Sequence, residues 1–334
     1  MNVLASHLKN FTEYAQVRGV AVNPLLKSID GLPPDPGSDT ALIRTNDFYA
    51  VLETVHEKLG DPLWGIKAGN FISMKLLGLI YQISLQTTTL SEALHYLGSY
   101  LAATLPLVSA SMQLTPERAT VTLEILDGKA ALNRVILENV CTIIAREIRM
   151  MSEQDPKLCL GSPFHDAHYP TGWSKSEAFA VSFEPGVLKA GMRSHARLHL
   201  ELLVPQYLKM IEEVKPDSSF ANRVKVTMLA LSDPKLPDIR RLCETLCMTP
   251  RTLQRRLEAE NVTFREVLEV LKKDLCSFLL RHEQYSIASI SYILGYSEPA
   301  AFLHAFKKWF GTTPERMRHR FRSQPEEPLK ELAM

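Results

Sequence analysis

The chain has no long apolar run and few cysteines. No hydrophobic stretch approaches the roughly 18–20 residues that span a bilayer. The first residues, MNVLASHLKN, lack the basic flank and apolar stretch of a signal peptide. The five cysteines are odd in number and widely scattered, so they do not indicate a disulfide framework. These absences predict a cytoplasmic protein with no membrane segment.

Catalytic signatures are also missing: the sequence has no P-loop, GxSxG, GxGxxG or HExxH motif. Two histidine pairs raise the alternative of a metal site: His165 with His168, which have Cys159 nearby, and His195 with His199, which are four residues apart. The CxxC density of a zinc module is absent, and such histidines are more often surface or hydrogen-bonded side chains. We therefore expect no metal, no cofactor and no enzymatic activity.

The chain has almost no net charge, with 38 Lys+Arg against 37 Asp+Glu, but the charges are unevenly distributed along it. Residues 1–216 hold 19 Lys+Arg and 22 Asp+Glu, a net −3, whereas residues 217–322 hold 18 and 12, a net +6. A basic segment joined to an acidic one favours nucleic-acid binding, although solvated charge on helices could give the same excess.

Periodicity divides the chain into a mixed α/β part and an all-helical part, an α+β protein overall. We predict an effector-binding regulatory domain over 1–205, a linker over 206–219, a helical domain over 220–322 and a flexible acidic tail over 323–334. Within the first domain the patterns predict several elements: a helix ending at Gly60, a strand pair around the TPER turn, a helix over about 128–152, and strands near 158–160 and 179–183.

The basic region contains one apolar pattern twice. Three positions of the first copy recur 48 residues later: Ile239, Leu242 and Leu246 match Ile287, Ile290 and Leu294. Past the turn the offset becomes 49, so Leu253 matches Phe302 and Leu257 matches Phe306. Each copy reads as helix, tight turn, helix, which predicts two helix-turn-helix motifs at about 238–258 and 286–310.

The first copy has the side chains that read base pairs. Thr249 is the expected N-cap of its second helix, and Pro250 fits the first turn. Arg251, Gln254 and Arg255 lie on the stripe opposite the inward leucines. Since a helix-turn-helix inserts its second helix into the major groove, where Arg and Gln pair with guanine and adenine edges, these side chains are candidate DNA contacts.

The second copy has a different outward surface. Gly295 permits the turn, and Ser297 is the expected cap of the following helix and a candidate DNA contact. Phe302 and Phe306 face inward with Trp309. The predicted partner of both motifs is double-stranded DNA.

The stretch LCMTPRTLQRRLEAENVTFREVL, followed by SIASISYILGYSEPAAFLHAFKKWFGTTPERMR, resembles the paired helix-turn-helix domain of the AraC/XylS family of bacterial transcription regulators, over roughly 220–321. The second motif has the family's residues at these positions: Ile290, Gly295, Tyr296, Ser297, Phe302, Phe306, Lys307, Gly311 and Pro314. Cys247 stands where the family usually has the turn glycine.

The resemblance implies a division of labour. Residues 264–283 would be the helix that joins the two motifs. Arg251, Gln254 and Arg255 correspond to the family's base-reading residues, and Pro299, Ala300 and His304 fall at the equivalent sites of the second motif. The proline and alanine have no side-chain donor. The second motif is therefore expected to bind backbone phosphates through Lys307 or Lys308.

The N-terminal part is similar to the arabinose-binding-like group of the family's sensor domains, on GLIYQISLQTTTLSEALHYL and FHDAHYP (164–170). The resemblance implies a small-molecule effector, contact with RNA polymerase, activation of transcription and a possible homodimer. Two alternatives stay open: a nonspecific nucleoid-type DNA-binding protein, and a DNA-repair enzyme with the same DNA-binding module. The latter would need a nucleophilic cysteine in a recognisable setting, which none of the five offers.

Overall fold

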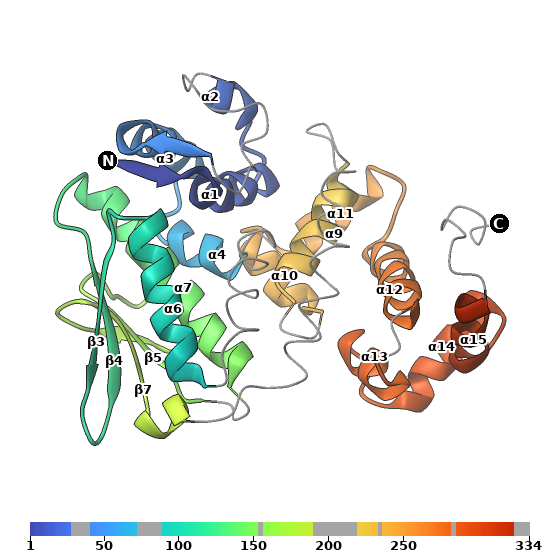
Figure 1. Ribbon diagram of the computed structural model, residues 1–334. Helices are drawn as coiled ribbons and strands as arrows, with labels where there is room; N and C mark the ends of the chain where they lie inside the picture. The colour runs from blue at the N-terminus through green and yellow to red at the C-terminus, as the bar shows by residue number, and fades with distance from the viewer. Residues whose placement is uncertain are drawn as a thin grey trace. The chain divides into compact units, whose positions relative to one another are not determined.

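The computed structural model describes residues 1–27, 41–71, 89–152, 156–189, 219–232, 236–281 and 285–323. The chain forms two compact units (Figure 1). We call residues 1–189 the N-terminal unit and residues 219–323 the C-terminal unit and describe each by itself. The predicted linker and tail lie outside the described residues, except for Ser219 and Ser323, so their boundaries remain predictions.

The N-terminal unit contains both helices and strands, which confirms the predicted mixed class. Its described helices are α1 (Ala5–Val17), α2 (Asn23–Lys27), α3 (Thr45–Leu59), α4 (Trp64–Asn70), α6 (Leu90–Thr104), α7 (Ala130–Met151) and the 3-10 helix η1 (Pro185–Lys189). Its described strands are β1 (Asn2–Leu4), β2 (Leu42–Arg44), β3 (Ser109–Leu114), β4 (Ala119–Glu124), β5 (Cys159–Ser162), β6 (Trp173–Lys175) and β7 (Phe179–Phe183).

Five of these strands form one sheet in the order β3-β4-β7-β5-β6. The predicted strand pair around the TPER turn is confirmed, with Met112 of β3 opposite Val121 of β4. All neighbours are antiparallel except β5 and β6, which run parallel. The three-residue strand β6 was not predicted, nor was the separate β1–β2 pair.

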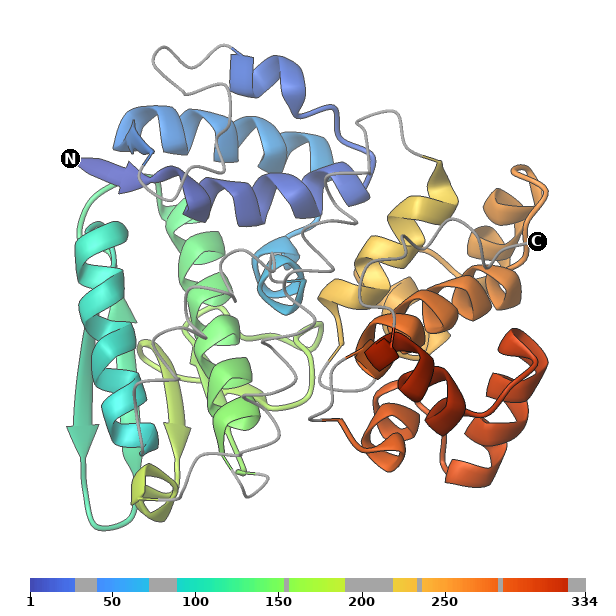
Figure 2. The ribbon, with the colours of Figure 1, turned by 45° about the vertical axis from the view of Figure 1, so that its right-hand side comes forward.

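Helix α7 covers much of this sheet. Its residues Ile136, Val140, Ile144 and Ile148 recur every four positions and are all buried, so one helical face is apolar along its whole length. Three of these residues, Ile136, Val140 and Ile144, line a cavity shared with α1 and α6. Helix α7 also contacts β4, β5 and β7, whereas α6 contacts β3. Both helices run along the sheet in Figure 2.

Helix α4 approaches α7 closely because two glycines face it. A Cβ atom on Gly65 would lie 2.4 Å from the carbonyl oxygen of Val135, and one on Gly69 would lie 2.8 Å from that of Asn139. The Asn139 side chain donates to the Gly65 carbonyl at 3.3 Å, which fixes the register of the two helices. Only glycine fits these two positions.

The C-terminal unit is all helical where described, as predicted. Its helices are α9 (Phe220–Ala230), α10 (Ile239–Thr245), α11 (Pro250–Glu258), α12 (Phe264–Arg281), α13 (Ile287–Ile293), α14 (Pro299–Phe310) and α15 (Pro314–Ser323). Helix α12 contacts α9, α11, α13 and α15. Its inward residues Leu271, Leu275 and Leu279 recur every four positions and are buried. Among the described helices of the whole chain, none is both long and apolar enough to cross a membrane.

Candidate DNA interface

The first predicted motif consists of α10, a short turn and α11. Thr249 is the N-cap of α11, as predicted: its hydroxyl accepts from the Thr252 backbone N–H at 3.2 Å. Leu253 and Leu257 are completely buried. Cys247 adopts a φ of 49°, so the turn has the left-handed conformation that glycine favours, even though the residue is a cysteine.

The opposite face of α11 is exposed and polar. Arg251, Gln254 and Arg255 are all exposed, and no side-chain hydrogen bond or ion pair joins them to another described residue. Two guanidinium groups and an amide therefore project from one stripe of the helix, without a side-chain partner in the part of the chain that the structure describes. These are the donor groups that read guanine and adenine in the major groove.

The neighbouring Arg256 has a different environment. Its guanidinium lies over the Phe220 ring, 5.4 Å from the centroid, and Arg223 lies over the same ring at 5.2 Å. Burial, followed by the positive charge of Arg256, lowers the pKa of Arg223. Arg256 thus packs α11 against α9, which separates it from the outward arginines of its own helix.

A carboxylate completes this junction. Glu260, just after α11, accepts from the backbone N–H groups of Phe220 and Ala221 at the start of α9. Ser219 caps the same helix by accepting from the Asn222 N–H. The first motif is therefore held by α9 as well as by its own apolar seam, so α11 presents its outward stripe on a fixed support.

The second predicted motif consists of α13, a turn and α14. Gly295 has a φ of 77°, which confirms its role in the turn. Phe302 and Phe306 are completely buried. The prediction that Ser297 caps α14 is wrong, because the N-cap residue is Glu298, whose side chain makes no capping hydrogen bond. The reason is the extra residue in this turn, which starts the helix one position later.

The outward face of α14 carries mixed side chains. His304, Lys307 and Lys308 are exposed, as predicted, and Ser297 is exposed in the turn. Leu303 is 41% exposed, and sequence reasoning missed it. The 49-residue offset could have found it, because it places Leu303 opposite Gln254 of the first motif.

The two motifs are joined by α12, which begins with a reciprocal cap. The Glu266 carboxylate accepts from the Thr263 N–H at 2.7 Å, and the Thr263 hydroxyl accepts from the Glu266 N–H at 3.2 Å. Trp309 of α14 donates its indole N–H to Glu269 of α12 at 3.1 Å. The predicted connecting helix is confirmed over Phe264–Arg281.

A further basic surface lies on α15, outside the predicted set. Arg316 and Arg320 are exposed there, whereas Arg318 donates to the Tyr285 carbonyl. The run ERMRHRFR was the sequence signal for these residues. Arg316 and Arg320 can contribute phosphate contacts without reading bases.

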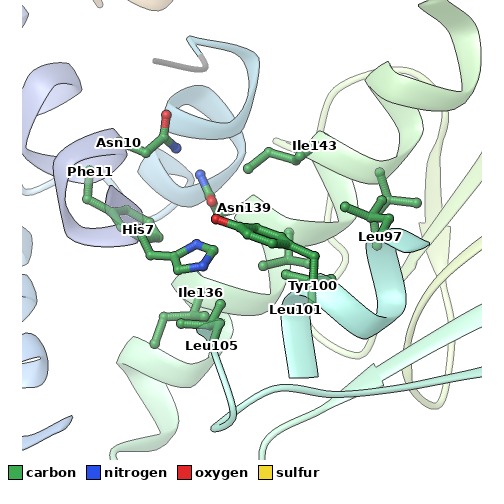
Figure 3. Close-up of a pocket in the computed structure, with 12 residues that line it drawn as sticks. His7, Asn10, Phe11, Leu97, Tyr100, Leu101, Leu105, Ile136, Asn139 and Ile143 are labelled. Atoms are coloured by element: carbon green, nitrogen blue, oxygen red, sulfur yellow. The ribbon is translucent and has the colours of Figure 1, made fainter. Parts of the chain in front are cut away.

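A narrow cavity lies among α1, α6 and α7 in the N-terminal unit (Figure 3). Its volume is about 20 Å³, enough for about one water molecule. The rings of His7 and Tyr100 meet there with centroids 5.9 Å apart, and His7 shares a 2.9 Å hydrogen bond with Thr104. Burial lowers the pKa of His7 to about 4, so this imidazole is neutral.

A larger, open hollow of about 480 Å³ lies between α6 and the β3–β4 strands. Its size falls in the range of small-molecule sites. Most of the side chains that line it are small or apolar, and its polar groups are His95 and three serines. The lining includes Ser91, Leu94, His95, Gly98, Ser99, Ala102, Ala110, Ser111, Met112 and Val121.

The histidines considered as metal ligands have other surroundings. His168 pairs with Asp166 at 3.2 Å on the surface, and Cys159 contacts the Ser174 hydroxyl at 3.3 Å. Within the described part of the chain no three His, Cys, Asp or Glu side chains gather as a metal site would require. His195 and His199 lie outside the described residues.

Comparison with known proteins agrees with these features. Residues 242–320 match the family model "Helix-turn-helix domain", and residues 19–163 match "Arabinose-binding domain of AraC transcription regulator, N-term". The chain is 24% identical to the HTH-type transcriptional regulator VirS of Mycobacterium tuberculosis, over 95% of this chain and 96% of that one. It is 36% identical to the transcriptional activator AggR of Escherichia coli, over 22% of this chain and 28% of that one.

The crystal structure of the transcriptional regulator CdpR from Pseudomonas aeruginosa aligns with a TM-score of 0.34 and 20% identity, over 80% of this chain and 91% of that one. The two family models and the paired motifs define the class: the protein is a DNA-binding transcription regulator. Within that class, the chain belongs to the AraC/XylS family and has an arabinose-binding-like N-terminal domain, as its sequence predicted.

Proposed function

We propose that this regulator recognises its target sequence chiefly through the first motif, with Arg251, Gln254 and Arg255 as base readers. The supporting observation is the outward stripe of α11, where the three side chains are exposed and without partners among the described residues. Lys307 and Lys308 in the last turn of α14 bind phosphates, with Ser297, His304 and Thr249 at the edge of the interface.

The test separates base reading from phosphate binding. A bidentate Arg–guanine contact contributes about 1–3 kcal/mol of discrimination against the wrong base. Loss of a phosphate contact weakens all sequences about equally and lowers the slope of the salt dependence by about one. We therefore expect Arg255→Ala to relax base preference in its part of the site, and Lys308→Ala to lower affinity uniformly.

Both variants are measured against a randomised-site library at two salt concentrations. Arg256→Ala is the matched control, because it removes the same charge from the same helix while its guanidinium packs on Phe220. It should leave base preference unchanged. Wild-type preferences in Arg255→Ala would refute the assignment, and a selected site no tighter than random duplex would favour the nonspecific alternative.

We further propose that a small organic effector binds the N-terminal unit in the hollow between α6 and β3–β4, and that binding controls activation by the cytoplasmic protein. The support is the size of the hollow and its mixed lining, together with the arabinose-binding match. Activation implies contact with RNA polymerase, and the chain is similar to the transcriptional activator AggR over 22% of its length. A homodimer and the absence of catalysis are part of the same proposal.

A panel of metabolites screened by thermal shift tests this second proposal. Gly98→Leu fills the hollow, because nothing lies within 4 Å of the added Cβ, and should abolish any ligand-induced shift. Ala103→Leu, at an exposed position of the same helix outside the lining, is the control. If no metabolite stabilises the wild-type chain, or if Gly98→Leu responds normally, this site is wrong.

A further inference from the structure

The first half of α14 presents an apolar surface where α11 presents donors. Pro299, Ala300, Ala301 and Leu303 are all exposed, with Leu303 at 41%. Phe302 and Phe306 of the same helix are completely buried, and their rings pack against each other with centroids 5.8 Å apart. A single exposed leucine is ordinary, but here four of the first five residues of a recognition helix are apolar and exposed, which fits a partner of matching chemistry.

The repeat relates these positions to the base readers of the first motif. With the 49-residue offset, Ala300 corresponds to Arg251 and Leu303 corresponds to Gln254. The backbone framework is shared, since Thr249 and Glu298 are the respective N-caps and a proline follows each. If α11 directs its outward stripe at base edges, α14 directs Ala300 and Leu303 at base edges too.

An apolar side chain in the major groove can still specify a base. Thymine is the base that presents a C5-methyl group there, and apolar side chains contact that methyl. Cytosine in its place would put an amino donor against a side chain that cannot accept, and leaving a polar group unpaired costs free energy. An apolar reader therefore favours thymine by contact and disfavours cytosine by desolvation.

We propose that Ala300 and Leu303 make the second motif a reader of thymine methyl groups. The inference rests on the proposed sequence-specific binding, and it adds that both motifs specify sequence, the first by hydrogen bonds and the second by apolar contact. The basic side chains Lys307 and Lys308 later in α14 then hold the adjacent backbone. DNA is favoured over a protein partner because these apolar positions match the outward positions of α11.

The experiment replaces thymine by deoxyuridine, which removes only the methyl group. A selected site is prepared with each thymine of the second motif's segment replaced in turn, and Kd is measured for the full chain. Burial of one methyl group corresponds to about a fourfold change in affinity. We expect a loss of that size at one or two positions in the wild-type protein.

Leu303→Ala supplies the second arm. This variant should bind the thymine site about as weakly as the wild type binds the deoxyuridine site. At the one thymine that Leu303 contacts, replacement by deoxyuridine should cause no further loss of affinity in the variant. Val270→Ala is the matched control, because Val270 is 42% exposed on α12 and lies outside α14. Val270→Ala should lose as much affinity on deoxyuridine substitution as the wild type does. The deoxyuridine measurement on the wild-type protein does not depend on the folding of any variant.

Three outcomes overturn the inference. If scrambling the second segment weakens binding but no deoxyuridine substitution does, methyl reading is wrong while sequence-specific binding stands. If Leu303→Ala lowers promoter activity with no change in Kd, the apolar surface contacts RNA polymerase. If no sequence is bound better than random duplex, the proposed function itself fails and the inference fails with it.

Discussion

The close approach of α4 and α7 predicts opposite effects for two glycine-to-alanine substitutions. A Cβ on Gly65 would lie 2.4 Å from the Val135 oxygen, 2.9 Å from its Cα and 3.0 Å from its carbonyl carbon. All three atoms belong to backbone, so no side-chain rotation relieves the clash. The other face of α7 packs against the sheet, so the helix cannot simply move away.

The magnitude follows from two opposing effects. Overpacking a well-packed core costs about 1–3 kcal/mol, and a backbone obstacle puts Gly65→Ala toward the upper end. Alanine in place of glycine gains up to about 1 kcal/mol of helix propensity. The net expected loss is therefore about 2 kcal/mol, or about 4–8 °C in Tm for a domain of this size.

Gly98→Ala in α6 is the matched comparison. Nothing lies within 4 Å of its added Cβ, so only the propensity gain remains and stability should rise by up to about 1 kcal/mol. Urea unfolding followed by tryptophan fluorescence measures both, because the completely buried Trp64 adjoins Gly65. A Gly65→Ala protein as stable as wild type, or an equal loss in Gly98→Ala, would refute the close-packing explanation.

Two further predictions concern single side chains. Burial lowers the pKa of His7 to about 4 from 6.5, so the unfolded chain takes up a proton first as pH falls. The free energy of unfolding should then decrease as the pH falls from about 6.5 to about 4, by up to about 3 kcal/mol. The urea midpoint of the wild type should follow this decrease, and the midpoint of His7→Gln should depend less on pH across the same range. Thr249→Ala removes the N-cap of α11 and should cost about 1 kcal/mol in thermal unfolding, whereas Thr249→Ser should restore it; equal stability of both would contradict the capping role.

The C-terminal unit was largely predictable because its determinants are local. The buried positions follow helical spacing, and the Thr249–Pro250 pair marks the start of α11 in the sequence itself. The error at Ser297 shows the limit of this reasoning. The extra residue in the second turn shifts the N-cap to Glu298, and residue preference pointed to the serine.

The N-terminal unit was predictable only in its long elements. Helix α7 and the β3–β4 pair have clear periodicity, and both were predicted. Strand β6 has three residues and pairs in parallel with β5, whose partner residues lie 13 positions earlier along the chain. Such a strand is determined by pairing at a distance, so its own residues carry little signal. The hollow could not be predicted from sequence for a related reason, since it is lined by α6, β3 and β4 together.

The candidate base readers show how a search for donors can mislead. Arg251, Gln254 and Arg255 were found because their hydrogen-bonding groups match base edges, and Leu303 was missed because it has none. Yet the repeated framework gives Gln254 and Leu303 equivalent places on equivalent helices. The buried positions of the two motifs stay apolar because each helix must pack, whereas the outward positions are free to differ in chemistry. A regulator built this way can match two unlike segments of DNA with one backbone design, hydrogen bonding to one and contacting methyl groups on the other.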